Sequence, residues 1–175
     1  ATSNGLDFVT VHSSETLAPG LLNLGLFSNY AVNTLPRYED AAGRRNKIGD
    51  SLIAADFNLG YGLTPMWDIG ISFPHVLHQK VNFVGSRGQF SKPGMTEVRA
   101  NTKWRLWGGR DGGGAVIVST NINLTDNNPY VGTGAKPTIN LEFAYDTSWR
   151  KIAMAANVGY RKRSPGSPNP EFPIE

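Results

Sequence analysis

Cysteine is absent from the 175 residues, which excludes disulfide scaffolds, thiolate metal ligands and cysteine nucleophiles. Long apolar runs are also missing, and none approaches the ~20 residues that a membrane-spanning helix requires. Charge is sparse, with 18% charged residues and a formal net charge of +3. That charge is too small to indicate a nucleic-acid partner without a clustered basic face. Glycine (20) and proline (11) are frequent, which favours a single domain of short elements and many turns.

Strict alternation of apolar and polar residues is the dominant pattern. It is clearest over residues 50–63, where Ile53, Phe57 and Leu59 alternate with Asp56 and Asn58. The same alternation predicts further strands at 22–30, 67–73, 97–106, 116–124, 139–146 and 152–161. No helical period of useful length occurs. We therefore expect an all-β, antiparallel up-and-down transmembrane β-barrel of about seven or eight strands, in this chain or as part of a larger barrel.

The expected connections fall into two length classes that alternate along the chain. Segments 32–49, 78–94, 125–137 and the tail after Lys162 are long, whereas 64–67, 108–114 and 147–151 are short. In an up-and-down sheet all short connections then lie at one end. Outer-membrane barrels have this arrangement, with short periplasmic turns and long extracellular loops.

The polar faces of these strands are expected to line a barrel interior. The candidate lumen-lining residues are Asp56, Asn58, Asp68, Glu97, Arg99, Lys103, Arg105, Asn121, Asn140 and Glu142. Their opposite charges favour mutual pairing over an open pore, because unpaired ions are costly in a narrow interior. Alternation alone equally allows a soluble antiparallel barrel that turns the apolar faces inward to bind an apolar ligand.

Aromatic residues favour the membrane alternative. All four tryptophans lie beside the short connections, and we expect an aromatic girdle of Tyr61, Trp67, Trp104, Trp107, Tyr145 and Trp149. Tryptophan and tyrosine prefer membrane interfaces, because the ring is apolar and its N–H or O–H needs a polar partner.

One segment also resembles a known family. The run Gly60-Tyr61-Gly62-Leu63-Thr64-Pro65-Met66-Trp67-Asp68-Ile69-Gly70-Ile71-Ser72-Phe73-Pro74 resembles the second hairpin of the outer-membrane barrel domains of the OmpA family. Residues 97–107, 123–126 and 157–161 resemble later strands, so the resemblance covers about residues 22–163. It implies a structural anchor in the outer membrane of a Gram-negative bacterium, with porin-like passage of small solutes as a second role. The family often carries a peptidoglycan-binding domain, and no such segment occurs in this sequence.

The two ends of the sequence depart from a regular barrel. We expect residues 1–17 to form a strap, a plug or an extra strand within 7–12, and the first residues indicate a processed, exported protein. Residues 164–175 are proline-rich and cannot pair as a central strand, so we expect an extracellular loop or a cut end. Either the 7–12 strand, a second chain or further copies would then complete the barrel.

Chemical motifs are weak throughout. No nucleophile elbow, phosphate loop or zinc-protease motif occurs, and Ser72, His75 and Asp68 form no triad by proximity alone, so we expect no enzyme. His75 with His78, and residues 125–128, lack the spacing of a metal site, so we assign no metal and no cofactor. The expected partners are membrane lipid and lipopolysaccharide. Basic residues in or beside the long loops would either bind lipopolysaccharide phosphates or simply be solvated. They are Arg44, Arg45, Lys47, Arg161, Lys162 and Arg163.

Overall fold

In the computed structural model, the segments with alternating apolar and polar residues are β-strands, and strands make up most of the described residues. The structure describes residues 11–33, 37–39, 45–47, 49–81, 93–109, 111–125, 136–150 and 152–163, with 37–39 and 45–47 described for their backbone alone. No helix in these ranges is long and apolar enough to cross a membrane.

The main sheet contains the seven predicted strands, and the strand predicted over 67–73 continues to Val81, into the predicted connection 78–94. Its long strands are β1 (Leu22–Val32), β4 (Asp50–Thr64), β5 (Trp67–Val81), β7 (Glu97–Gly109), β8 (Gly112–Asn123), β9 (Thr138–Trp149) and β10 (Ile152–Lys162). A short strand β6 (Gly94–Met95) pairs with β5, and a separate ribbon consists of β2 (Arg37–Glu39) and β3 (Arg45–Lys47). The fold is therefore all-β and antiparallel, as predicted.

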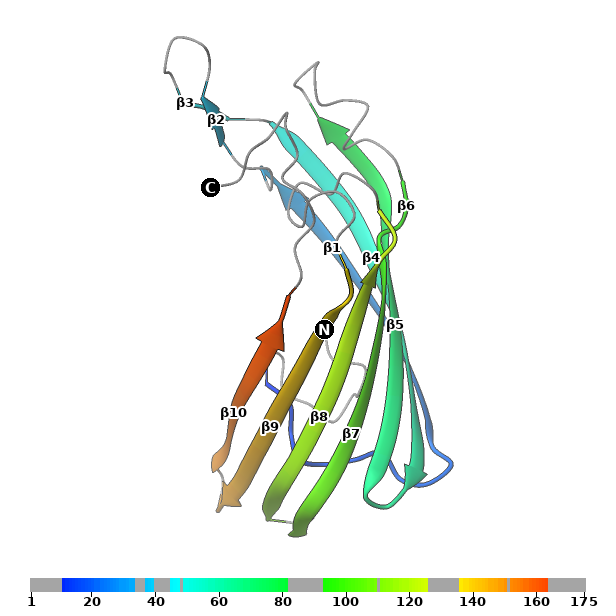
Figure 1. Cartoon of the computed structure of the whole chain (residues 1–175), viewed down its shortest axis with the longest axis vertical. Coiled ribbons are helices and arrows are strands. Elements are labelled where there is room, and N and C mark those ends of the chain that lie inside the picture. Colours follow the sequence, from blue (N-terminus) through cyan, green and yellow to red (C-terminus); the bar gives the residue numbers. More distant parts are fainter. Residues whose placement is uncertain are drawn as a thin grey trace.

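The sheet is an up-and-down meander that curls into a half-barrel. The long strands are ordered β1-β4-β5-β7-β8-β9-β10, so each strand lies beside its neighbours in the chain. The β4–β5, β7–β8 and β9–β10 hairpins all turn at the lower end in Figure 1, which we name the short-turn end. The strand ends that the long connections join lie at the opposite end, which we name the long-loop end. The predicted sorting of connections by length is confirmed.

One predicted turn is wrong in extent. The sequence predicts a short connection over residues 108–114, but β7 continues to Gly109 and β8 begins at Gly112, and these two residues pair with each other. Glycine offers no side chain for an alternation pattern, yet its backbone groups complete the ladder as well as those of any residue. The alternation pattern therefore missed the end of β7 and the start of β8, which are paired in the structure.

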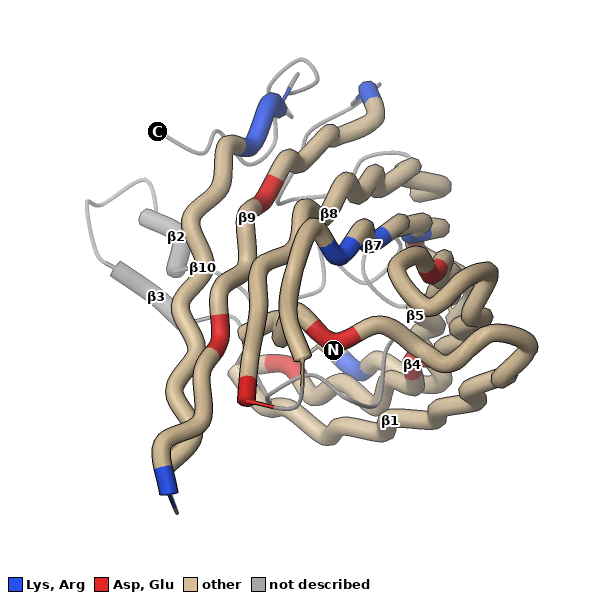
Figure 2. The backbone as a smooth tube through the Cα atoms, turned by 90° about the horizontal axis from the view of Figure 1, so that it is seen from below, with Lys and Arg blue, Asp and Glu red and all other residues tan. Residues whose placement is uncertain are grey.

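The two faces of the curled sheet differ sharply in polarity. The outer, convex face carries large apolar side chains that are mostly exposed, from Leu24 in β1 to Val158 in β10. The inner, concave face carries the polar residues, and several of these are buried, among them Asn58, Asp68, Ser72 and Lys103. Figure 2 looks along the strands from the short-turn end and shows the open curl of the sheet.

A segment before the first strand lies across the short-turn end. Residues 11–21, which we name the strap, contain no strand and run to the start of β1 (Figure 1). Of the segment proposed as an extra strand, Val11 and His12 belong to the strap, and residues 7–10 lie outside the described residues. The strap contacts the inner face, as described below.

Candidate functional site

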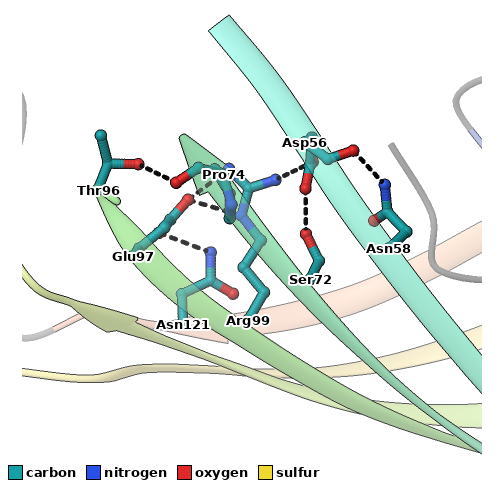
Figure 3. Close-up of polar contacts among 8 residues, drawn as sticks. All are labelled: Asp56, Asn58, Ser72, Pro74, Thr96, Glu97, Arg99 and Asn121. Atoms are coloured by element: carbon teal, nitrogen blue, oxygen red, sulfur yellow. Dashed lines mark hydrogen bonds and ion pairs between the residues drawn. The ribbon is translucent and has the colours of Figure 1, made fainter. Parts of the chain in front are cut away.

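The inner face is the candidate functional site, because chemistry-bearing side chains converge there from four neighbouring strands. Strand register places Asn58 of β4 opposite Ser72 of β5, Ser72 opposite Arg99 of β7, and Arg99 opposite Asn121 of β8. These residues, with Asp56 and Glu97, form what we name the wall cluster (Figure 3).

Arg99 is the centre of the wall cluster. Its Nη1 atom lies 3.5 Å from Asp56 Oδ2, its Nε donates a hydrogen bond to Glu97 Oε1 at 2.6 Å, and its Nη2 also contacts that oxygen. One guanidinium thus bridges two carboxylates on different strands. Such charge-assisted hydrogen bonds are stronger than neutral ones. The side chain of Arg99 is 36% exposed and that of Asp56 only 13%, so the ion pair is partly screened from solvent.

The remaining carboxylate oxygens of the wall cluster have neutral donors. Ser72 Oγ donates to Asp56 Oδ1 at 2.5 Å, and Asn121 Nδ2 donates to Glu97 Oε2 at 3.5 Å. The Asn58 amide donates to the backbone carbonyl of Asp56 at 3.1 Å. The cluster therefore links the inner faces of β4, β5, β7 and β8 and satisfies its own charges to a large extent.

A second polar row joins the last three strands. Arg161 Nε donates to Asn140 Oδ1 at 2.7 Å, and Asn140 Nδ2 donates to Ser119 Oγ at 2.9 Å. The Asn157 amide donates to Glu142 Oε1 on the neighbouring strand. Asn140 and Glu142 thus reach polar partners across β8, β9 and β10 on the inner face.

The strap occupies the short-turn end of this face. The backbone N–H of Leu17 donates to Asp68 Oδ2 at 2.9 Å, and the N–H of Ser14 donates to Asp146 Oδ1 at 2.5 Å. Lys103 Nζ in turn donates to the carbonyl of Glu15 at 3.0 Å. Asp68 and Lys103 are each only 2% exposed. These charged side chains therefore bind the strap backbone instead of facing an open lumen.

Close backbone packing holds the end of the strap. The N–H of Gly20 donates to the carbonyl of Gly62 at 2.8 Å, and the N–H of Gly62 donates to the carbonyl of Leu21 at 3.0 Å. A Cβ atom on Gly62 would lie only 2.0 Å from the carbonyl oxygen of Ala18. Glycine is required at this position because the strap backbone lies directly against β4.

The structure places the ten candidate lumen-lining residues on one face, but it divides them among different roles. Seven belong to the wall cluster or the second row, and Asp68 and Lys103 bind the strap. Arg105 donates from Nη2 to the carbonyl of Gly109 at 2.9 Å, beside the β7–β8 turn. Ser72, Ser14 and Leu17 were absent from the predicted set. The position of Ser72 on the polar face of its strand could have identified it as an inward residue. Nothing in the sequence of the strap indicated that Ser14 and Leu17 bind the inner face.

The aromatic side chains lie on the outer face near the short-turn end. Exposed fractions range from 39% for Tyr61 to 64% for Trp149, with Trp67, Trp104, Trp107 and Tyr145 between them. The rings of Trp67 and Trp104 stack with centroids 6.4 Å apart, and Trp67 Nε1 donates to Thr102 Oγ1 at 2.6 Å. These six residues therefore form one outward aromatic band.

Trp107 reaches this band through a β-bulge. Strict alternation would place it with Arg105 on the inner face, but the register shifts between Arg105 and Trp107. After the shift Trp107 pairs with Gly114, and its ring lies 5.8 Å from that of Phe143. Bulges commonly redirect a side chain in this way.

The structure does not bring the residues of the weaker motifs together as a catalytic or metal site in the part of the chain that it describes. Asp68 and Ser72 lie on the inner face of β5, whereas alternation places His75 on the other face, and Ser72 hydrogen-bonds Asp56. Within the described ranges no three His, Asp or Glu side chains gather as a metal site would require. No family model, curated protein or solved structure matches the chain.

Proposed function

We propose that the chain forms the wall of an integral outer-membrane β-barrel that anchors its protein in the envelope of a Gram-negative bacterium. The observation that supports this most strongly is the inverted polarity of the curled sheet. Large apolar residues on the convex face are exposed, whereas the concave face holds charged residues, of which Asp68 and Lys103 are buried. A membrane barrel requires this arrangement, since its outside contacts lipid.

The size of the apolar surface adds to the argument. Outward residues such as Leu24, Leu141 and Val158 are 70%, 53% and 70% exposed. A water-soluble protein rarely exposes such a continuous apolar face. Lipid would cover this surface, and strands of 11–15 residues are long enough to cross a bilayer, which takes roughly 9–11 residues.

The aromatic band and the connections suggest an orientation. The band would lie at the periplasmic interface, where indole N–H groups meet water and headgroups. The long connections would then face the exterior, with Lys162 and Arg163 near lipopolysaccharide phosphates, whereas Arg161 is hydrogen-bonded to Asn140 on the inner face. The basic residues Arg44, Arg45 and Lys47 would join them, although their side chains lie outside the described residues.

Anchoring is favoured over solute passage by the contents of the inner face. The wall cluster pairs Arg99 with Asp56 and Glu97, and Glu142 and Arg161 are hydrogen-bonded to asparagines. The strap also lies across the short-turn end and binds Lys103. The resemblance of the sequence to the OmpA family also supports an anchoring role. Any attachment to peptidoglycan would need a separate domain.

A soluble barrel that binds an apolar ligand is the alternative. It would need the apolar faces inside, and the inner face of the described sheet instead holds Asp68 and Lys103. Such an interior offers a lipid-like ligand little apolar contact. The membrane proposal accounts for both faces at once.

Detergent dependence tests the proposal. We expect the protein in the membrane fraction, and a folded β-sheet spectrum only in detergent or lipid. A monodisperse, β-rich monomer in detergent-free buffer would overturn the proposal. Native mass spectrometry of the detergent extract, with denaturing mass spectrometry beside it, would also identify every chain present.

A further inference from the structure

Among the described residues, the two outermost strands of the sheet have long edges with few charges, no proline and no bulge. β1 and β10 have 11 residues each, and within the described residues each pairs on one side only. β1 contains no charged residue and no proline, and β10 is charged only at Arg161 and Lys162. Their pairings with β4 and β9 show no bulge. Natural edge strands normally carry charges, proline, bulges or a covering element, so these edges are suited to pairing.

The two edges run in the same direction. Every step along the path β1-β4-β5-β7-β8-β9-β10 is antiparallel, and this path has six steps. An even number of reversals leaves β10 parallel to β1, and both run from the short-turn end to the long-loop end (Figure 1). Direct closure would therefore make a parallel pair, whereas antiparallel closure needs an odd number of added strands.

Additional copies of this chain do not satisfy that condition. Copies that share one orientation in a membrane would place β10 of one beside β1 of the next, again in parallel. Inverted copies would pair β1 with β1 antiparallel, but their long loops would lie on opposite sides of the membrane. Neither arrangement is an all-antiparallel barrel with its loops sorted to one side.

The sequences of the two flanks do not favour long strands either. Residues 164–175 contain Pro165, Pro168, Pro170 and Pro173, which cannot donate to a central ladder. Residues 1–10 alternate only from Asp7 onward, and pairing along an 11-residue edge calls for a run of about ten residues.

We propose that β1 and β10 both pair with one polypeptide segment from outside these 175 residues that adds an odd number of antiparallel strands. The strands next to β1 and β10 both run from the long-loop end to the short-turn end. The need for closure rests on the proposed function, because unpaired backbone groups are most costly in lipid; the direction follows from the fold alone.

The neighbouring faces also define the side chains of this segment. Its outward positions are apolar, because they continue a surface on which Leu24 and Val158 are 70% exposed. Its inward positions are mostly small or polar, because they adjoin Asn23 and Gly25 of β1 and Asn157 of β10. Phe27 of β1 is the exception, since it lies beside Gly25 and is 53% exposed, so one inward position next to it is apolar. The partner is thus an amphipathic β-segment, and not a helix or a flat apolar surface.

Photo-crosslinking in the full-length protein, in the cell envelope where it is made, tests the proposal. Benzoylphenylalanine replaces one outward residue at a time, Leu22, Leu24 or Leu26 on β1 and Met154 or Val158 on β10. Mass spectrometry then maps the cross-linked residue. Leu59 on β4 is the matched control, because β1 and β5 occupy both of its sides.

We expect cross-links to a sequence outside the 175 residues. For each residue that the probe advances along β1, the cross-linked position should move back by about one residue, as antiparallel pairing requires. Positions that advance with the probe, cross-links from β1 to β10, cross-links to β1 of another copy, cross-links to residues 1–10 or 164–175, or the absence of any ordered cross-link would each overturn the proposal. Membrane fractionation of the same cells tests the proposed function separately.

Discussion

Leu141 gives the sharpest test of which face of the sheet meets lipid. It lies on the outer face of β9 and is 53% exposed. Its neighbour Asn140 lies on the inner face and accepts a hydrogen bond from Arg161. Leu141→Arg places a charge on the outer face, and Asn140→Asp places one on the inner face beside an arginine.

The expected cost follows from the depth of Leu141. β9 spans Thr138–Trp149, so Leu141 lies 2.5 residues from its centre. With a rise of about 3.4 Å per residue and a tilt of about 40°, that is about 6.5 Å from the midplane of an apolar band about 25 Å tall. An arginine costs about 2–4 kcal/mol at the midplane and about 0–1 kcal/mol near the interfaces. We therefore expect Leu141→Arg to lower the free energy of unfolding by about 1–3 kcal/mol.

Urea unfolding in lipid vesicles measures this difference. Asn140→Asp should change the free energy of unfolding by less than about 0.5 kcal/mol, because its carboxylate meets Arg161 on a polar face. If Leu141 were exposed to water, Leu141→Arg would also change it by less than about 0.5 kcal/mol. That result, or an equal loss in both variants, would refute the assignment of the faces.

Three further substitutions test the inner face, the strap and the bulge. Arg99→Met should lower the free energy of unfolding by about 1–2 kcal/mol, a modest loss because the Arg99 side chain is 36% exposed. Added salt should make this loss smaller. A loss that does not depend on salt would contradict an ionic role for Arg99. Asp68→Ala should speed amide exchange in residues 11–21 about tenfold by releasing the strap, and unchanged exchange would contradict that anchor. Gly114→Val should displace Trp107, whose ring lies 2.4 Å from the site of the new Cβ, and so shift the tryptophan fluorescence. Gly109→Ala is the control, because a Cβ at Gly109 meets open space. Equal fluorescence spectra of the two variants would contradict the contact between Gly114 and Trp107.

Strand positions and face polarity were predictable from the sequence because both depend on local alternation. The pattern over 50–63 corresponds to β4, and the assignment of Asp56 and Asn58 to one face follows from the period of two. Register was not predictable, because it depends on which residues meet across strands. Only the structure aligns Asn58, Ser72, Arg99 and Asn121 in one row.

The strap and the aromatic bulge lay outside the reach of pattern reasoning for different reasons. The strap is bound mainly through its backbone, so its side chains carry no signature of the contacts to Asp68 and Lys103. Trp107 was assigned to the girdle from its position beside a turn. Alternation contradicts that assignment, and only the register shift after Arg105 explains how the residue reaches the outer face.

Fluorescence quenching by brominated lipids would test the central claim most directly. The four tryptophans all lie on the outer face near one end, with Trp104 63% and Trp149 64% exposed. In vesicles, lipids brominated close to the headgroup should quench this emission more than lipids brominated deep in the acyl chain, and aqueous acrylamide should quench it weakly. Strong quenching by acrylamide, with none from either brominated lipid, would contradict a membrane-embedded barrel.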